Sequence, residues 1–208
     1  PFRSRVCSDQ WKSVAPGRRG VIVIHGFICN RGIWTPWLVA LRAQGNTCVA
    51  LNLEPVFASI DHYAAQIETA VSRMTAGTGC TPLLVCHSMG GLAVRAWLRA
   101  AGPGAEERVF HVITLGTPHH GTWMSRFGIS ASALQMRHKG PWVRQLIADE
   151  PISQAARFTC WYSNCDNIVI PASAARLAGA ENRFAPGLAH VQLALDPKVM
   201  RASLEKLG

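Results

Sequence analysis

Apolar and polar positions alternate along the chain in blocks that predict strands and helices in turn. Residues 21–24 (VIVI) are all apolar and β-branched, a pattern typical of a strand buried on both faces of a sheet. Comparable short apolar runs lie between turn residues farther along the chain. They predict four more strands, at residues 47–51, 82–86, 109–115 and 157–162, and residues 182–184 are expected to form a brief sixth strand.

Between or after these strands, four stretches have the pattern of helices. The clearest is residues 59–74, where apolar residues recur at steps of four, four and three and therefore share one helix face. The other predicted helices span residues 36–43, 89–101 and 196–207, and the last begins with Asp196 followed by Pro197. Strands that alternate with helices predict an α/β fold built from βαβ units around a parallel sheet.

Residues 121–150 interrupt this alternation. They include several large apolar side chains but have no strand pattern. An apolar insertion after a strand end predicts a small lid or cap over a site. An ordinary pair of surface helices explains the pattern equally well, and both readings stay open at this point.

The length and composition fit a single domain over residues 1–208. Hydrophobic residues make up 49% of the chain and charged residues 16%, so the chain can bury a core. No apolar run reaches the roughly 18 residues that a membrane-spanning helix needs. The formal net charge is +9, which favours anionic lipid or an acidic substrate as a partner. The basic residues are scattered instead of forming a stripe with aromatics, so nucleic acid is not expected as a partner.

The cysteines and the first residue bear on the compartment. The seven cysteines lack CxxC spacing, and several lie inside apolar runs, where cysteine acts as a small buried hydrophobe. No disulfide framework is expected, although a single bridge stays open. The chain begins at Pro1 without an initiator methionine, so we expect a removed N-terminal segment and a secreted, periplasmic or membrane-anchored protein. A cytoplasmic location stays open, as does the oligomeric state.

Ser88 lies where a buried strand passes directly into a helix, in the segment LLVCHSMGG. The sharp turn at such a junction strains the serine backbone and crowds its neighbours, so small residues are needed two positions before and two after it. Gly90 fills the second position, and Cys86 fills the first in place of the more usual glycine. Gly91 lets the helix pack closely. The pattern predicts a nucleophilic serine, whereas the alternative is a serine that only caps a helix.

A serine nucleophile needs a base, an orienting acid and donors for the developing oxyanion. Asp166 follows the predicted strand at 157–162, where a carboxylate is well placed as the acid, and a turn-forming aspartate is the alternative. His190 lies later, in a predicted loop before the last helix, and is the expected base. Phe27 follows the first strand in the segment HGF, so its backbone N–H and that of Met89 are the expected oxyanion donors. An ordinary turn is the alternative for HGF.

Aromatic residues near the expected entrance suggest an apolar acyl group. Trp34, His87 and Trp123 are the candidate substrate-binding residues, whereas Trp37 is better explained as a core residue. The adjacent pair at positions 119 and 120 follows a strand end and is expected to brace the site loops, because neighbouring histidines rarely bind one metal ion. We therefore expect neither a metal nor a cofactor.

Five short motifs occur together in one order: HGF, CHSMGG, GTPHHGT, SNCDNIV and GLAH. With them the chain resembles the α/β-hydrolase superfamily over residues 21–207, and within it the small bacterial triacylglycerol lipases and carboxylesterases. The resemblance implies Ser88 as nucleophile, Asp166 as acid and His190 as base, with Phe27 and Met89 as backbone oxyanion donors. It also implies a minimal fold of about six mainly parallel strands, with helices on both faces and a small lid-like insertion.

The predicted reaction is hydrolysis of carboxylic esters through an acyl-enzyme, as in a lipase or esterase. A serine acyltransferase, a thioesterase and a cutinase-like polyesterase are alternatives on the same triad, and a non-catalytic binding domain is a further one. The expected partner is a small-molecule or lipid ester, with transient contact with a lipid or polyester surface.

Overall fold

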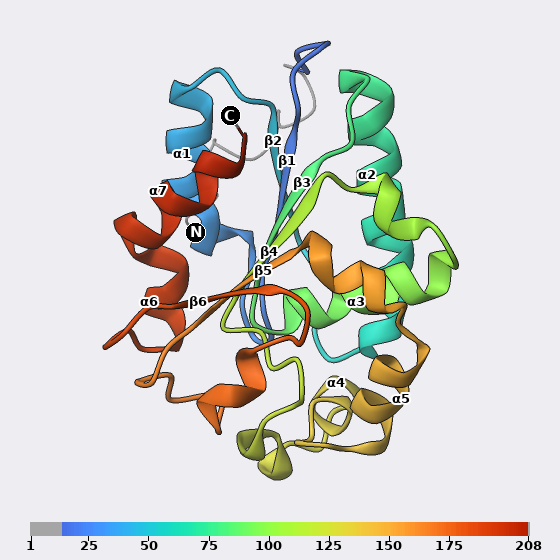
Figure 1. The fold of residues 1–208 in the computed structure, drawn as a ribbon, viewed down its shortest axis with the longest axis vertical. Helices are drawn as coiled ribbons and strands as arrows, with labels where there is room; N and C mark the ends of the chain where they lie inside the picture. The colour runs from blue at the N-terminus through green and yellow to red at the C-terminus, as the bar shows by residue number, and fades with distance from the viewer. Residues whose placement is uncertain (1–13, 208) are drawn as a thin grey trace.

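Six parallel strands form a single sheet in the computed structural model, which describes residues 14–207 (Figure 1). The strands follow the order β2-β1-β3-β4-β5-β6 across the sheet, so the chain starts inside it, moves to one edge and returns to build toward the other. Their bounds are β1 (Val21–Ile24), β2 (Cys48–Leu51), β3 (Leu83–His87), β4 (His111–Leu115), β5 (Phe158–Tyr162) and β6 (Glu181–Phe184). The number and direction of the strands confirm the predicted fold class.

Helices cover both faces of the sheet (Figure 1). One face packs against α2 (Ala64–Thr78) and α3 (Met89–Ala101), and the other against α1 (Thr35–Ala43), α6 (His190–Leu195) and α7 (Pro197–Leu204). Successive side chains of a strand point to opposite faces. In β1, accordingly, Ile22 and Ile24 join the core of the first face, whereas Val21 and Val23 join the core of the second. This double burial explains why β1 has no polar position.

Short 3₁₀ helices complete several predicted elements. The helix expected at 59–74 consists of η3 (Ile60–Tyr63) followed by α2, which is capped at its C-terminus by Gly79 with a φ of 72°. The helix expected at 196–207 consists of α7 and η8 (Glu205–Leu207), and the Asp196 side chain caps it as expected. The other 3₁₀ helices are η2 (Arg31–Trp34), η4 (Ala105–Arg108), η5 (Trp123–Phe127), η6 (Ile152–Arg157) and η7 (Ala172–Ala175).

Residues 121–150 fold at the carboxyl edge of the sheet as η5, α4 (Ala131–Gln135) and α5 (Pro141–Asp149) (Figure 1). The Asp61 carboxylate of η3 holds this segment, because it accepts hydrogen bonds from Gln135 Nε2 at 2.8 Å and Trp142 Nε1 at 2.9 Å. The same carboxylate pairs with Arg99 of α3 at 2.6 Å. The segment is therefore tied to the sheet-covering helices by side-chain hydrogen bonds. Its role as a lid stays a prediction.

A buried ion pair closes the segment at its far end. Arg95 of α3 has no exposed surface, and its Nε and Nη2 each donate to one oxygen of Glu150 at 2.6 Å. Its Nη1 also donates to the His119 carbonyl at 2.9 Å. Buried charges are tolerated only when they are paired and hydrogen-bonded, so the pair fixes residue 150 and the loop after β4 relative to α3.

Candidate active site

Ser88 occupies the sharp turn between β3 and α3. Its backbone has a φ of 54° and a ψ of −125°, a strained conformation for a residue with a side chain. A Cβ at Gly90 would lie 2.7 Å from the carbonyl oxygens of Ile24 and His25, and one at Gly91 would lie 2.3 Å from Thr117 Oγ1. A side chain at position 90 or 91 would clash with these atoms, which explains the two glycines that follow Met89.

Asp166 and His190 form a close pair on the other side of the turn. Asp166 Oδ2 lies 2.9 Å from His190 Nδ1, and both side chains are buried. The second carboxylate oxygen accepts the N–H groups of Ile168 at 2.9 Å and Val169 at 2.8 Å, which fixes the carboxylate in its turn. Gly116 packs against the pair: a Cβ there would lie 3.0 Å from Asp166 Oδ2 and 3.1 Å from His190 Nδ1.

His190 does not lie in a loop as the sequence predicts, but is the first residue of α6. The Gln192 side chain accepts the Ala189 N–H at 2.8 Å, which stabilises the start of this helix. A helix of six residues is too short to show a periodic pattern, which explains why the sequence gives no sign of it.

One cavity of about 510 Å³ brings the serine and the histidine together. Both Ser88 and His190 line it, and most of the other lining side chains are apolar. In the described part of the chain no hydrogen bond joins the Ser88 hydroxyl to His190, so that contact stays a prediction. Apolar lining residues include Phe27, Ile28, Met124, Phe127, Ala133, Met136, Ile168 and Val191.

The loop after β1 presses against the serine. A Cβ at Gly26 would lie 2.7 Å from Ser88 Cβ, so only glycine fits there. Phe27 follows and lines the cavity, and Met89 is the first residue of α3. Within residues 14–207, neither the Phe27 N–H nor the Met89 N–H donates to another protein group. Their role as oxyanion donors stays a prediction.

His87 lines the same cavity but packs mainly on His190. The two ring centroids are 4.6 Å apart, and His87 Nε2 lies 3.2 Å from the His190 carbonyl oxygen. Burial, reinforced by the neighbouring His190, lowers the pKa of His87 to about 3, so its ring is neutral. Its contact with substrate stays a prediction.

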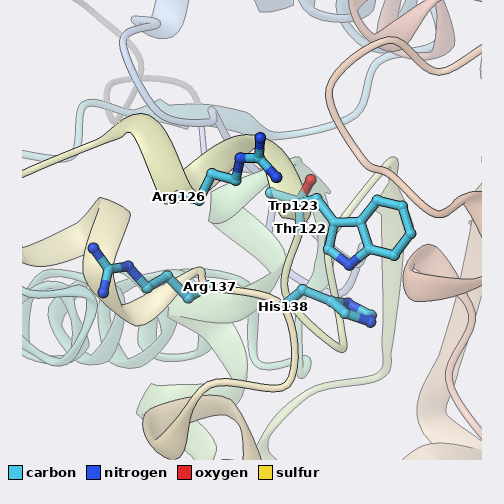
Figure 2. Close-up of a pocket in the computed structure, with 5 residues that line it drawn as sticks. All are labelled: Thr122, Trp123, Arg126, Arg137 and His138. Atoms are coloured by element: carbon cyan, nitrogen blue, oxygen red, sulfur yellow. The ribbon is translucent and has the colours of Figure 1, made fainter.

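Trp34 and Trp123 do not line this cavity, contrary to expectation. Trp34 is 0% exposed and packs edge-on against Trp37 at 5.6 Å, because η2 turns it into the core beside α1. Trp123 is 54% exposed and lines a separate hollow of about 400 Å³, where its ring meets His138 edge-on at 5.8 Å (Figure 2). Its neighbour Met124 lines the cavity instead.

His119 is buried in a polar network behind the site. Its Nε2 lies 3.1 Å from Thr114 Oγ1 and 3.4 Å from Cys160 Sγ, and its Nδ1 lies 3.3 Å from Arg95. These contacts fit the expected bracing role. No group of three or more metal-ligand side chains occurs among the residues that the structure describes.

Two buried histidines predict acid sensitivity of the fold. Burial lowers the pKa of His87 to about 3 and that of His119 well below 6.5. The unfolded chain therefore binds protons below about pH 6.5 that the folded chain does not, and each histidine lowers stability by up to about 1.4 kcal/mol per pH unit on acidification. Urea denaturation from neutral pH to about pH 5 should show this slope. The decrease in the free energy of unfolding per pH unit should be smaller in His119→Gln and unchanged in the exposed His62→Gln. An equal slope in His119→Gln would contradict the prediction.

The sequence matches a model of the alpha/beta hydrolase family over residues 21–202, and the chain belongs to that family. No curated protein matches the chain by sequence.

Several solved structures share the fold. The mature Bacillus licheniformis lipase BlEst2 superposes with a TM-score of 0.80 at 16% identity, over 92% of this chain and 93% of that one. The Paleococcus ferrophilus monoacylglycerol lipase gives 0.66 at 16% identity, over 93% and 95%. Aspergillus fumigatus lipase B gives 0.75 at 18% identity over 96% of this chain, which spans about half of that lipase (53%). At such identities the similarity shows the fold alone. None of the described helices has the length and apolar character needed to cross a bilayer.

Proposed function

We propose that this protein is a serine hydrolase that cleaves carboxylic esters through an acyl-enzyme. The observation that carries the proposal is the shared cavity: a strained serine and a histidine paired with a buried aspartate line one apolar space. Membership of the alpha/beta hydrolase family supports the same chemistry.

In the proposed first step, Ser88 Oγ attacks the ester carbonyl carbon while His190 Nε2 takes the hydroxyl proton. The tetrahedral intermediate then collapses, its bond to the alcohol oxygen breaks, and the imidazolium gives its proton to the leaving alcohol. In the second step His190 takes a proton from water, the hydroxide attacks the acyl carbon, and Ser88 leaves with the proton restored.

The remaining groups stabilise charge that appears during the reaction. Asp166 accepts a hydrogen bond from the Nδ1–H of His190, which keeps the proton on Nδ1, leaves Nε2 free to act as the base and stabilises the imidazolium. The Phe27 and Met89 N–H groups would bind the oxyanion, where one such donor contributes about 3 kcal/mol to transition-state binding.

The cavity supports a substrate with an apolar acyl group. Its rim continues into exposed apolar side chains, with Ile28 70%, Phe127 71% and Ile129 94% exposed. The Arg126 guanidinium lies over the Phe127 ring at 4.7 Å, which adds positive charge beside the apolar rim. This combination favours esters presented at a lipid surface, and the lipase names of the neighbours in fold agree with it.

The rim predicts a difference between soluble and surface-bound substrate. Ile129→Ser should lower activity on an ester held in anionic vesicles by about fivefold to tenfold, because partial burial of an isoleucine side chain in the lipid surface contributes about 1 to 1.4 kcal/mol. Activity on a soluble short-chain ester should not change, because Ile129 does not line the cavity. Val39→Ser on α1, which is also exposed, is the control. Equal losses for the two variants on vesicles would contradict a docking role for the rim.

Product analysis tests hydrolysis itself. A soluble ester is incubated with the protein in the presence and absence of an added acceptor alcohol, and acid and transferred ester are quantified. We expect free acid as the main product in both cases. Transfer that outcompetes hydrolysis would make the protein an acyltransferase and overturn the hydrolase assignment.

A further inference from the structure

His25 is a buried histidine at the end of β1 whose ring has both nitrogens engaged. The Leu53 backbone N–H points to Nε2 at 2.9 Å, and Nδ1 lies 2.8 Å from the Gly26 carbonyl oxygen. A backbone N–H can only donate, so Nε2 must be the acceptor and carries no proton. The ring proton of the neutral imidazole is therefore on Nδ1, from which it is donated to Gly26 O.

The charge state of the ring agrees with this assignment. Burial lowers the pKa of His25, so the neutral form prevails at neutral pH. With Nε2 held as an acceptor by the Leu53 N–H, the Nδ1–H form is the tautomer that satisfies both contacts.

The Gly26 carbonyl and the Phe27 N–H belong to the same peptide group. That group is planar and trans, so its C=O and N–H point in opposite directions. A ring that holds the carbonyl on one side therefore holds the N–H on the other. The restraint matters because Gly26 has no side chain to fix the rotation of this peptide, and its Cα is pressed against Ser88.

From this geometry we infer that His25 is a positioning residue: through Gly26 O it aims the Phe27 N–H into the cavity as an oxyanion donor. The inference rests on the proposed function and deepens it. An oxyanion forms only as the reaction proceeds, so a misdirected donor should lower kcat and leave KM nearly unchanged.

Two substitutions separate this role from simple packing. In His25→Asn, the amide nitrogen takes the place of Nδ1, so the bond to Gly26 O is retained and the Leu53 contact is lost. In His25→Gln, the amide oxygen takes the place of Nε2, so the Leu53 contact is retained and the donor to Gly26 O is lost. If His25 had only a structural role, the loss of activity in each variant would follow its loss of stability. It would not depend on which of the two contacts the variant keeps.

The experiment measures kcat and KM for a soluble p-nitrophenyl ester, with thermal unfolding as a parallel readout. We expect His25→Gln to lower kcat by about 10- to 100-fold at similar KM. This decrease in kcat is smaller than the one that complete removal of an oxyanion donor would cause. His25→Asn should stay within a few-fold of the wild type. A kcat in His25→Asn as low as in His25→Gln, or an unchanged kcat in His25→Gln, would overturn the inference.

Nitrogen NMR of the wild-type imidazole keeps the inference testable if either variant fails to fold. The expected signal is the Nδ1–H tautomer of His25, whereas an Nε2–H tautomer would overturn the inference. The proposed function is tested separately by Ser88→Ala. Ester turnover that survives in this variant would overturn the serine mechanism, and this result does not depend on the tautomer of His25.

Discussion

Replacing Ser88 with alanine should lower kcat for a soluble ester by about 10⁴-fold or more, because the variant lacks the hydroxyl that would form the acyl-enzyme. The fold should survive, since alanine adds no atoms to the turn and the strained backbone is already supported by Gly90 and Gly91. The measurement is p-nitrophenyl ester hydrolysis by the wild type and the variant, with circular dichroism to confirm folding.

Ser125→Ala is the matched control for this experiment. Ser125 lines the same cavity, and its hydroxyl donates to the Thr122 carbonyl at 2.7 Å, so it has a structural bond and no part in the proposed chemistry. It should retain activity within a few-fold of the wild type. Turnover that survives in Ser88→Ala, in a preparation free of contaminating esterase, would remove the proposed nucleophile.

Asp166→Asn should lower kcat by about 10⁴-fold while the fold stays intact. Oδ1 of Asp166 accepts the Ile168 and Val169 N–H groups, and an asparagine can retain these bonds only by keeping its oxygen there. Its NH₂ group then faces His190 Nδ1, which must become the acceptor. The proton moves to Nε2, and the imidazole can no longer act as a base toward Ser88.

The control for this variant is Asp196→Asn. Asp196 also accepts two backbone N–H groups, from Lys198 and Val199 at 2.9 Å each, but it caps α7 outside the cavity. It should leave kcat unchanged. A loss of less than about tenfold in Asp166→Asn would show that this carboxylate does not set the tautomer of the base.

Most of the sheet could be predicted because five of its six strands are short, mainly apolar runs with a clear end, whereas the edge strand β6 (ENRF) is polar and exposed or half-buried. β1 is the simplest case, since burial on both faces leaves no polar position. Boundaries shifted by one or two residues, as with β3, which starts at Leu83 and includes His87. The short helix α6 was missed because six residues cannot display a helical period.

The candidate site was predictable where backbone geometry restricts the residue type. The turn at Ser88 demands glycine at position 90 because two carbonyl oxygens lie against it, and that demand is visible in the sequence. The burial of Trp34 in the core and the position of Trp123 at a separate hollow could not be predicted, because the direction of a large aromatic side chain depends on tertiary packing. The contact of the His25 ring with the Leu53 N–H was also hidden, since these residues come together only when β1 and β2 pair.

The most direct test of the account is covalent labelling with a p-nitrophenyl alkylphosphonate, followed by intact mass measurement and peptide mapping. The account predicts one phosphonyl group per chain on Ser88, release of one equivalent of p-nitrophenol, and no labelling of Ser88→Ala. A stable adduct on another side chain, such as the Cys29 thiol that also lines the cavity, would contradict it, and so would continued ester turnover by fully labelled protein.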